Sequence, residues 1–173
     1  MLLGLALAAC AAPTPDPPSG RTGTARRGTF SFPLRTEPST LDFAAAADAS
    51  SVLVARLLGD SLVDHDAQLR IVPRLAEAWE WSADGRTLTF HLRPGVRFHD
   101  GTPLTAADVR FTFERVIDPA TRALMWIEPL LPVERVETPD PLTVRVHYRH
   151  PYGPALHGWD VPILPRHLRD GGA

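Results

Sequence analysis

The sequence feature that most constrains the fold is a pair of alternating runs joined by a short turn. The run Arg86–Leu92 alternates strictly between polar and apolar side chains, and Glu77–Ser82 alternates before it. The residues between them, Ala83-Asp84-Gly85, include an Asp and a Gly that suit a tight turn. Two alternating runs around such a turn are typical of a β-hairpin. The side chains expected to share a face are Trp79 and Trp81 in the first run, and Leu88, Phe90 and Leu92 in the second.

A second hairpin is predicted later in the chain. The runs Val133–Glu137 and Leu142–Tyr148 flank the turn-forming sequence Thr-Pro-Asp-Pro. Proline and aspartate favour a turn at this point, and the second run alternates as a strand does. The side chains expected on its apolar face are Leu142, Val144, Val146 and Tyr148.

The remaining segments supply short strands and helices. Gly28–Leu34 alternates weakly and is interpreted as a first strand, and Leu62-Val63 and Leu69–Val72 are further strand candidates. Asp48 is suited to cap a helix over about 50–58. Antiparallel hairpins with interspersed helices predict an α+β fold.

The most patterned segment is Leu92–Arg115. Pro94-Gly95 suits a type II turn, and Asp100-Gly101 suits a second turn after the short strand Val96–Phe98. Thr105-Ala106-Ala107-Asp108 then has the hydroxyl and the acid of a helix capping box. The helix that follows is expected to end before Pro119 and to carry one apolar stripe of Val109, Phe113, Val116 and Ile117.

The His99-Asp100-Gly101 sequence raises the question of a reactive or metal-binding centre. A catalytic centre needs a base, an orienting group and a nucleophile in contact, and the chain has neither Gly-x-Ser-x-Gly nor a phosphate-binding loop. The spacing of His147, His150 and His157 matches no zinc template, so metal binding there is the less favoured alternative. We therefore expect no catalytic residue, metal or cofactor, and interpret His99-Asp100 as a corner between strand and helix.

The charge of the chain argues against nucleic acid as a partner. The net charge is −2, whereas a nucleic-acid binder carries a strongly basic surface. All 18 basic residues are arginine, which excludes Schiff-base and P-loop chemistry because both use lysine. Scattered arginines in a chain rich in alanine and proline are interpreted as a codon bias of the source.

The first residues are typical of an export signal. An apolar run at residues 2–9 ends in small residues before Cys10, the only cysteine. Leu7-Ala8-Ala9-Cys10 resembles the lipobox of bacterial lipoproteins, in which the cysteine is lipidated; an inert buried cysteine is the alternative. No positive charge precedes the run, so the true start is expected to lie upstream of Met1. Residues 11–28 hold four prolines among small and polar residues, which predicts a flexible tether.

A family resemblance rests on three separate motifs. The run "PRLAEAWEWSADGRTLTFHLRPGVRFHDGTPLTAADVRFTFERVIDP", Pro73 to Pro119, closely resembles the signature region of the bacterial extracellular solute-binding proteins of family 5. "TEPSTLD", Thr36 to Asp42, resembles the first loop of that family, although Phe43 stands where a proline usually follows. "VPILPRH", Val161 to His167, resembles a later element. The motifs occur in the family's order and cover about residues 29–167.

The resemblance implies a periplasmic-binding-protein-like fold of type II, in which an extra α+β domain is inserted into the first of two lobes. Members of this family are usually about three times as long as this chain. We therefore expect only part of the first lobe and most of the inserted domain, as in a truncated or split gene product. The expected divisions are a signal remnant at 1–9, a tether at 10–28, the first lobe at 29–60, the inserted domain at 61–160 and re-entry into the first lobe at 161–173.

The same resemblance implies a function in transport rather than catalysis. The family captures peptides, nickel complexes or related solutes outside the membrane and delivers them to the permease of an ABC importer. By this resemblance, the loop of Glu37, Pro38 and Ser39 lies at the cleft and contacts the solute, although Glu37 also suits a simple turn. The expected location is extracytoplasmic, in the periplasm or anchored to the membrane through Cys10. The alternative is a tethered interaction module that binds no solute because the second lobe is missing.

Overall fold

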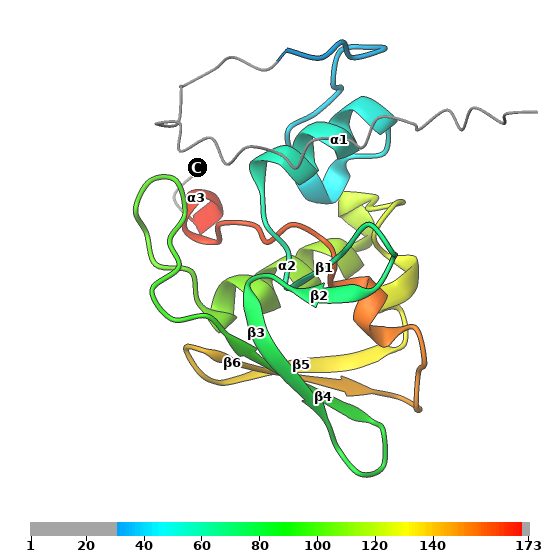
Figure 1. Cartoon of the computed structure of the whole chain (residues 1–173), viewed down its shortest axis with the longest axis vertical. Coiled ribbons are helices and arrows are strands. Elements are labelled where there is room, and N and C mark those ends of the chain that lie inside the picture. The colour runs from blue at the N-terminus through cyan, green and yellow to red at the C-terminus, as the bar shows by residue number, and fades with distance from the viewer. Residues whose placement is uncertain (1–30, 171–173) are drawn as a thin grey trace, which may run out of the picture. The chain divides into compact units, whose positions relative to one another are not determined.

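The computed structural model describes residues 31–170, and the predictions on the signal remnant, Cys10 and the tether fall outside these residues. Residues from Leu34 onward form one unit of mixed helices and strands (Figure 1). The order of its helices and strands is η1 (Phe43–Ala45), α1 (Ala49–Leu58), β1 (Val63–His65), β2 (Ile71–Pro73), β3 (Ala76–Trp81), β4 (Thr87–Leu92), α2 (Ala106–Ile117), η2 (Pro119–Thr121), η3 (Glu128–Leu130), β5 (Val133–Asp140), β6 (Thr143–Tyr148), η4 (Ala155–Trp159) and α3 (His167–Asp170).

Both predicted hairpins are present and join into one antiparallel sheet. The strand order is β3-β4-β6-β5, so the second strands of the two hairpins are neighbours. Phe90 is paired with Trp79 on one side and with Val144 on the other. The Ala83-Asp84-Gly85 turn closes the first hairpin, and Gly85 has a φ of 66°, which an L side chain rarely adopts. A separate two-stranded sheet pairs β1 with β2.

The core lies between the four-stranded sheet and α2. Leu88, Phe90 and Leu92 of β4 are buried, as the alternation predicts. The rings of Phe90 and Trp159 meet edge to face, with centroids 5.7 Å apart. Such a pair adds to the free energy gained by burying the two rings. The other buried side chains at this interface are Val109, Phe113 and Val116 of α2 and Val144, Val146 and Tyr148 of β6.

The helices begin where the capping residues predict. Asp48 is the N-cap of α1, and its Oδ1 accepts a hydrogen bond from Ser51 N at 2.9 Å. Asp108 in the first turn of α2 completes the capping box, and Thr105 N donates to its Oδ2 at 2.9 Å. The helix α2 ends at Ile117, and Asp118 has extended backbone angles before Pro119.

Several local expectations are wrong. Leu142 is 37% exposed because β6 begins one residue later and Leu142 lies in the turn. Ile117, at the end of the α2 stripe, is also 37% exposed. Residues 31–34 form no strand, because a strand requires a hydrogen-bonded neighbour. Val96–Phe98 forms only a single bridge, from Arg97 to Pro103.

Candidate functional site

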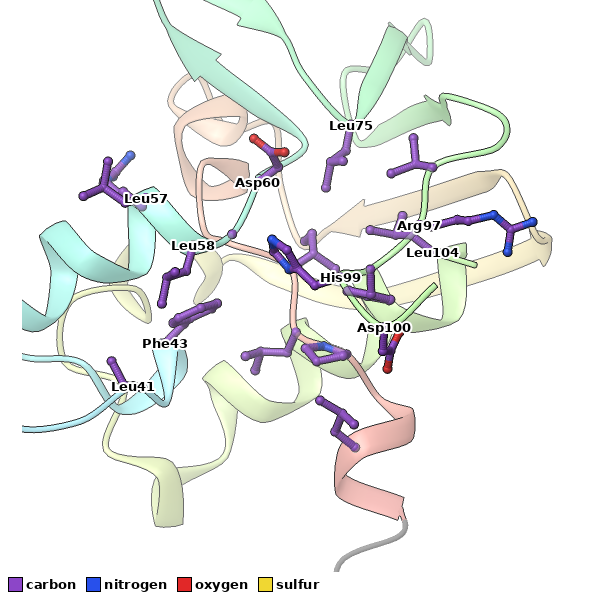
Figure 2. A pocket seen from close by; sticks show the side chains of 18 of the residues that line it. Leu41, Phe43, Leu57, Leu58, Asp60, Leu75, Arg97, His99, Asp100 and Leu104 are labelled. Carbon is purple, nitrogen blue, oxygen red and sulfur yellow. The ribbon is translucent and has the colours of Figure 1, made fainter. Parts of the chain in front are cut away.

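A pocket of about 670 Å³ lies in the described part of the chain. Figure 2 shows that its side chains come from distant parts of the sequence. They belong to the loop entering η1, the end of α1, the turns between β4 and α2, and the segment leading into α3. The lining residues are Leu41, Asp42, Phe43, Arg56, Leu57, Leu58, Gly59, Asp60, Leu75, Val96, Arg97, Phe98, His99, Asp100, Leu104, Ile163, Leu164, Pro165 and Leu168.

The pocket has an apolar floor and a partly charged rim. Leu75, Leu104, Ile163 and Leu164 are buried beneath it. Large apolar side chains around the opening remain accessible to solvent, which is unusual for a cluster of this kind. The exposed fractions are 63% for Leu41, 62% for Leu57, 46% for Leu58 and 63% for Leu168.

One wall of the pocket is the double turn between β4 and α2. Gly95 and Gly101 have φ values of 75° and 88°, as the two predicted turns require. Asp100 Oδ1 accepts a hydrogen bond from Thr102 N at 2.9 Å, and Arg97 Nη1 donates to Gly101 O at 2.7 Å. These bonds fix the wall without using a regular strand.

The side chain of Asp100 joins this turn to α3. Its Oδ2 lies 2.5 Å from Nε2 of His167. The imidazole also lies near Phe98, with ring centroids 5.5 Å apart. The hydrogen bond with His167, followed by the bond from Thr102 N, lowers the pKa of Asp100 to about 2. The His-Asp pair that the sequence places in a corner therefore has its acid engaged with a histidine 67 positions away.

A buried clamp on α2 holds the segment that leads to α3. Thr112 is 1% exposed, and its Oγ1 accepts a hydrogen bond from Leu164 N at 2.9 Å while donating to Asp108 O at 2.8 Å. Asp108 Oδ1 accepts from Arg166 N at 3.2 Å. Because these groups are shielded from water, the bonds fix the path of residues 164–166 along α2.

The opposite wall is held by a second set of polar contacts. Trp126 Nε1 donates to Phe43 O at 2.9 Å, and Arg56 lies over the Trp126 ring at 5.2 Å. Asp42 Oδ2 lies 3.5 Å from Arg115 Nη2 on α2. These contacts fasten the η1 loop and α1 beside the pocket.

The loop predicted to contact the solute lies against the start of α1. Ser39 Oγ donates to Asp48 Oδ2 at 2.6 Å, and Ser39 N donates to Ser51 Oγ at 2.9 Å. The hydrogen bonds from Ser39 and then from Ser51 lower the pKa of Asp48. Glu37 and Ser39 are exposed and Pro38 is half-buried, and none of the three lines the pocket, whereas Leu41 does.

The pocket combines apolar side chains with a small number of charged ones. Its lining includes acids, arginines and His99, but no Ser, Thr, Cys, Lys or Tyr. Over residues 31–170, no three His, Cys, Asp or Glu side chains gather closely enough to hold a metal ion. His147 contacts Thr87, whereas His157 contacts His65, so the histidines that are near in sequence do not share a site.

Sequence reasoning missed the pocket and its partners. Leu57, Leu58 and Leu168 belong to no motif of the sequence and line one pocket only through the fold. One signal was present, because His167 ends one family-like motif and Asp100 lies within another. Among the helices of residues 31–170, none is both long enough and apolar enough to cross a membrane.

The fold and the site together define a periplasmic-binding-protein type of architecture. The oligopeptide-binding protein OppA of Haemophilus influenzae, solved with the peptide RPPGFSPFR, superposes with a TM-score of 0.71 at 30% identity, covering 77% of this chain and 30% of that one. NikZ of Campylobacter jejuni, solved with Ni(L-His), gives a TM-score of 0.70 at 27% identity, covering 79% of this chain and 27% of that one.

Sequence comparison agrees with the structural one. The family model described as bacterial extracellular solute-binding proteins, family 5 Middle, matches residues 70–167. Di/tripeptide-binding protein 4 of Pseudomonas aeruginosa is 34% identical, covering 93% of this chain and 32% of that protein. The chain belongs to the family 5 extracellular solute-binding proteins. It spans about a third of the length of Di/tripeptide-binding protein 4 and of Protein XP55 of Streptomyces lividans, another relative that it matches.

Proposed function

We propose that this chain is part of the extracytoplasmic substrate-binding component of an ABC importer, which captures a solute and delivers it to the permease. The observation that carries the proposal is the agreement of fold and family over the same residues. Peptides are the favoured solute class, because Di/tripeptide-binding protein 4 and the peptide complex of OppA are both similar to this chain. NikZ, with its nickel-histidine complex, supports a wider class of small solutes.

We place the solute contact at the Glu37–Ser39 loop. The bonds of Ser39 to Asp48 and Ser51 support this, because they hold the loop in place while leaving Glu37 exposed. A preorganised loop loses less conformational entropy when it binds a ligand. The exposed Glu37 would then be available to a peptide.

We infer that the chain has no catalytic activity of its own. The lack of Ser, Thr, Cys, Lys and Tyr in the pocket lining supports this inference, as does the binding role in the name of Di/tripeptide-binding protein 4. Asp100 is the acid of the pocket whose pKa is lowered to about 2. Its carboxylate is hydrogen-bonded to His167 and to Thr102 N rather than to a reactive group.

We also propose that Cys10 carries a lipid that anchors the protein to the membrane. The support is the apolar run and small residues that precede Cys10 in the sequence. Labelled palmitate should be incorporated into the parent chain in a bacterial host and lost in Cys10→Ala. Incorporation that survives this substitution would refute the anchor.

The second candidate is a tethered module that binds another polypeptide instead of a solute. It is favoured by the solvent-exposed leucines around the pocket. We infer domain boundaries near 60/61 and 160/161, so that the pocket draws on both first-lobe segments, 29–60 and 161–173. In this view the pocket is the surface that receives the other polypeptide.

Isothermal titration against pools of di-, tri- and longer peptides separates the two candidates. The titrations use the chain alone and the chain with the remaining portion of a family member, supplied in cis or in trans. Saturable binding in either form supports the solute-binding role, and Glu37→Ala should weaken it while Glu77→Ala, an exposed acid on β3, should not. Heat from the added polypeptide but from no peptide pool would favour the module.

A further inference from the structure

Two histidines from distant segments contact each other at the surface of the molecule. His65 is the last residue of β1 and His157 lies in η4. Their rings stack with centroids 5.0 Å apart, and Nε2 of His65 lies 3.0 Å from Nδ1 of His157. At this distance the two nitrogens share a hydrogen bond, in which one ring donates and the other accepts. A protonated imidazole has no acceptor nitrogen, so the bond exists only while at least one ring is neutral.

A carboxylate links this pair to α1. Asp160 Oδ2 lies 4.0 Å from His65 Nδ1 and 2.9 Å from Nη2 of Arg56. Arg56 in turn lies over the ring of Trp126. The polar chain therefore joins α1, the segment after η4, and β1.

The other charged groups near the pair are already matched. On β1 itself, Asp64 Oδ2 lies 2.9 Å from Arg74 Nη2, and next to β1 Asp66 Oδ2 lies 2.7 Å from Arg70 Nη2. Each nearby carboxylate thus has an arginine partner, as Asp160 has in Arg56. The pair can bind a first proton and keep its hydrogen bond. A second proton would place two positively charged rings side by side. The charged groups on β1 and just after it are Asp64 and Asp66 with their partners Arg74 and Arg70, and those on α1 and after η4 are Arg56 and Asp160.

We propose that the His65–His157 pair is an acid-sensitive latch, which fastens η4 and the Asp160 segment to β1 and opens when both rings bind a proton. Imidazole groups change charge in the range between about pH 5 and pH 8. In acid, each of the two imidazoles binds a proton when the segment is unfolded, whereas the closed latch holds one proton between the two rings. Stability therefore rises with pH in this window and falls as the solution is acidified.

Nitrogen NMR of the parent chain tests the latch without any substitution. The ring nitrogen shifts of His65, His157 and His150 are followed from pH 8 to pH 4.5. We expect His65 and His157 to bind protons in two separate steps, because the first proton disfavours the second. His150, whose Nδ1 lies 3.2 Å from Pro151 O, is the internal control and should show one step. A single common step for all three would overturn the proposal.

Hydrogen exchange of the η4 amides measures the opening itself. The measured protection is corrected for intrinsic exchange rates. In the parent it should fall about tenfold between pH 7 and pH 5, because two proton-binding steps that differ by one pH unit correspond to a factor of about ten. In His157→Gln the fall should stay below about twofold, because the second imidazole is gone. His150→Gln should behave as the parent does. Equal losses in the parent and in His157→Gln would overturn the latch.

Discussion

Nε2 of His167 lies 2.5 Å from Oδ2 of Asp100, across 67 positions of sequence. The contact ties the turn that precedes α2 to the segment that follows the second hairpin. Together with the Thr112–Leu164 bond it fixes one wall of the pocket. Asp100 therefore holds one wall of the pocket in position, and its hydrogen bonds stabilise the negatively charged form of its carboxylate.

Replacing Asp100 with Asn should lower stability in a manner that depends on pH. The folded pKa of about 2 lies below the ordinary value of 3.8, so the stabilisation is present above about pH 4 and is lost as the pH falls towards 2. The urea midpoint of Asp100→Asn should lie below that of the parent at pH 6, and the gap should narrow at pH 3.

The control for this prediction is Glu77→Gln, which makes the same acid-to-amide change at an exposed site on β3. Its midpoint should follow the parent at both pH values. A gap for Asp100→Asn that is absent at pH 6, or the same size at pH 3, would contradict the assignment.

Replacing Thr112 with Val should destabilise the folded chain by about 1–3 kcal/mol, because Leu164 N would lose its acceptor in a buried site. Valine has nearly the same shape, so packing changes little. Urea unfolding provides the measurement, and Thr89→Val on β4 is the matched control. The clamp would be refuted by a Thr112 variant as stable as the control.

Replacing Gly101 with Ala should cost about 1–2 kcal/mol, because an L side chain at a φ of 88° is strained. An added Cβ would meet no atom within 4 Å at Gly101 or at Gly153, so only the backbone angle differs between the two sites. Thermal unfolding should therefore show a loss for Gly101→Ala and little change for Gly153→Ala. Equal midpoints would show that the turn relaxes without strain.

The exposed leucines of the pocket should make the chain bind an apolar dye such as anilinonaphthalene sulfonate. Dye fluorescence should fall in Leu57→Glu, which places a charge at the rim, where Leu57 is 62% exposed. Leu69→Glu is the control, because Leu69 is 80% exposed but does not line the pocket. A parent chain that binds no dye, or equal losses in both variants, would contradict this description.

Local patterns in the sequence were sufficient to predict the elements of the sheet and its main helix. Alternation places Leu88 and Phe90 on the buried face of β4, and the Thr105–Asp108 cap marks the start of α2. These features depend on residues within a few positions of one another, so periodicity and capping chemistry suffice. Leu142 shows the limit, because a shift of the strand boundary by one residue moved it from the apolar face into the turn.

By itself the sequence determined the two hairpins, the capped helix and the motifs that identify the family. Only the tertiary structure decided which distant groups meet: His167 with Asp100, His65 with His157, and the leucines of α1 with residues 163–168. Such contacts depend on how the hairpins and helices pack together, and the pattern of one segment has no information on the distance to another. The pocket and the histidine pair are therefore properties of the assembled chain rather than of any single segment.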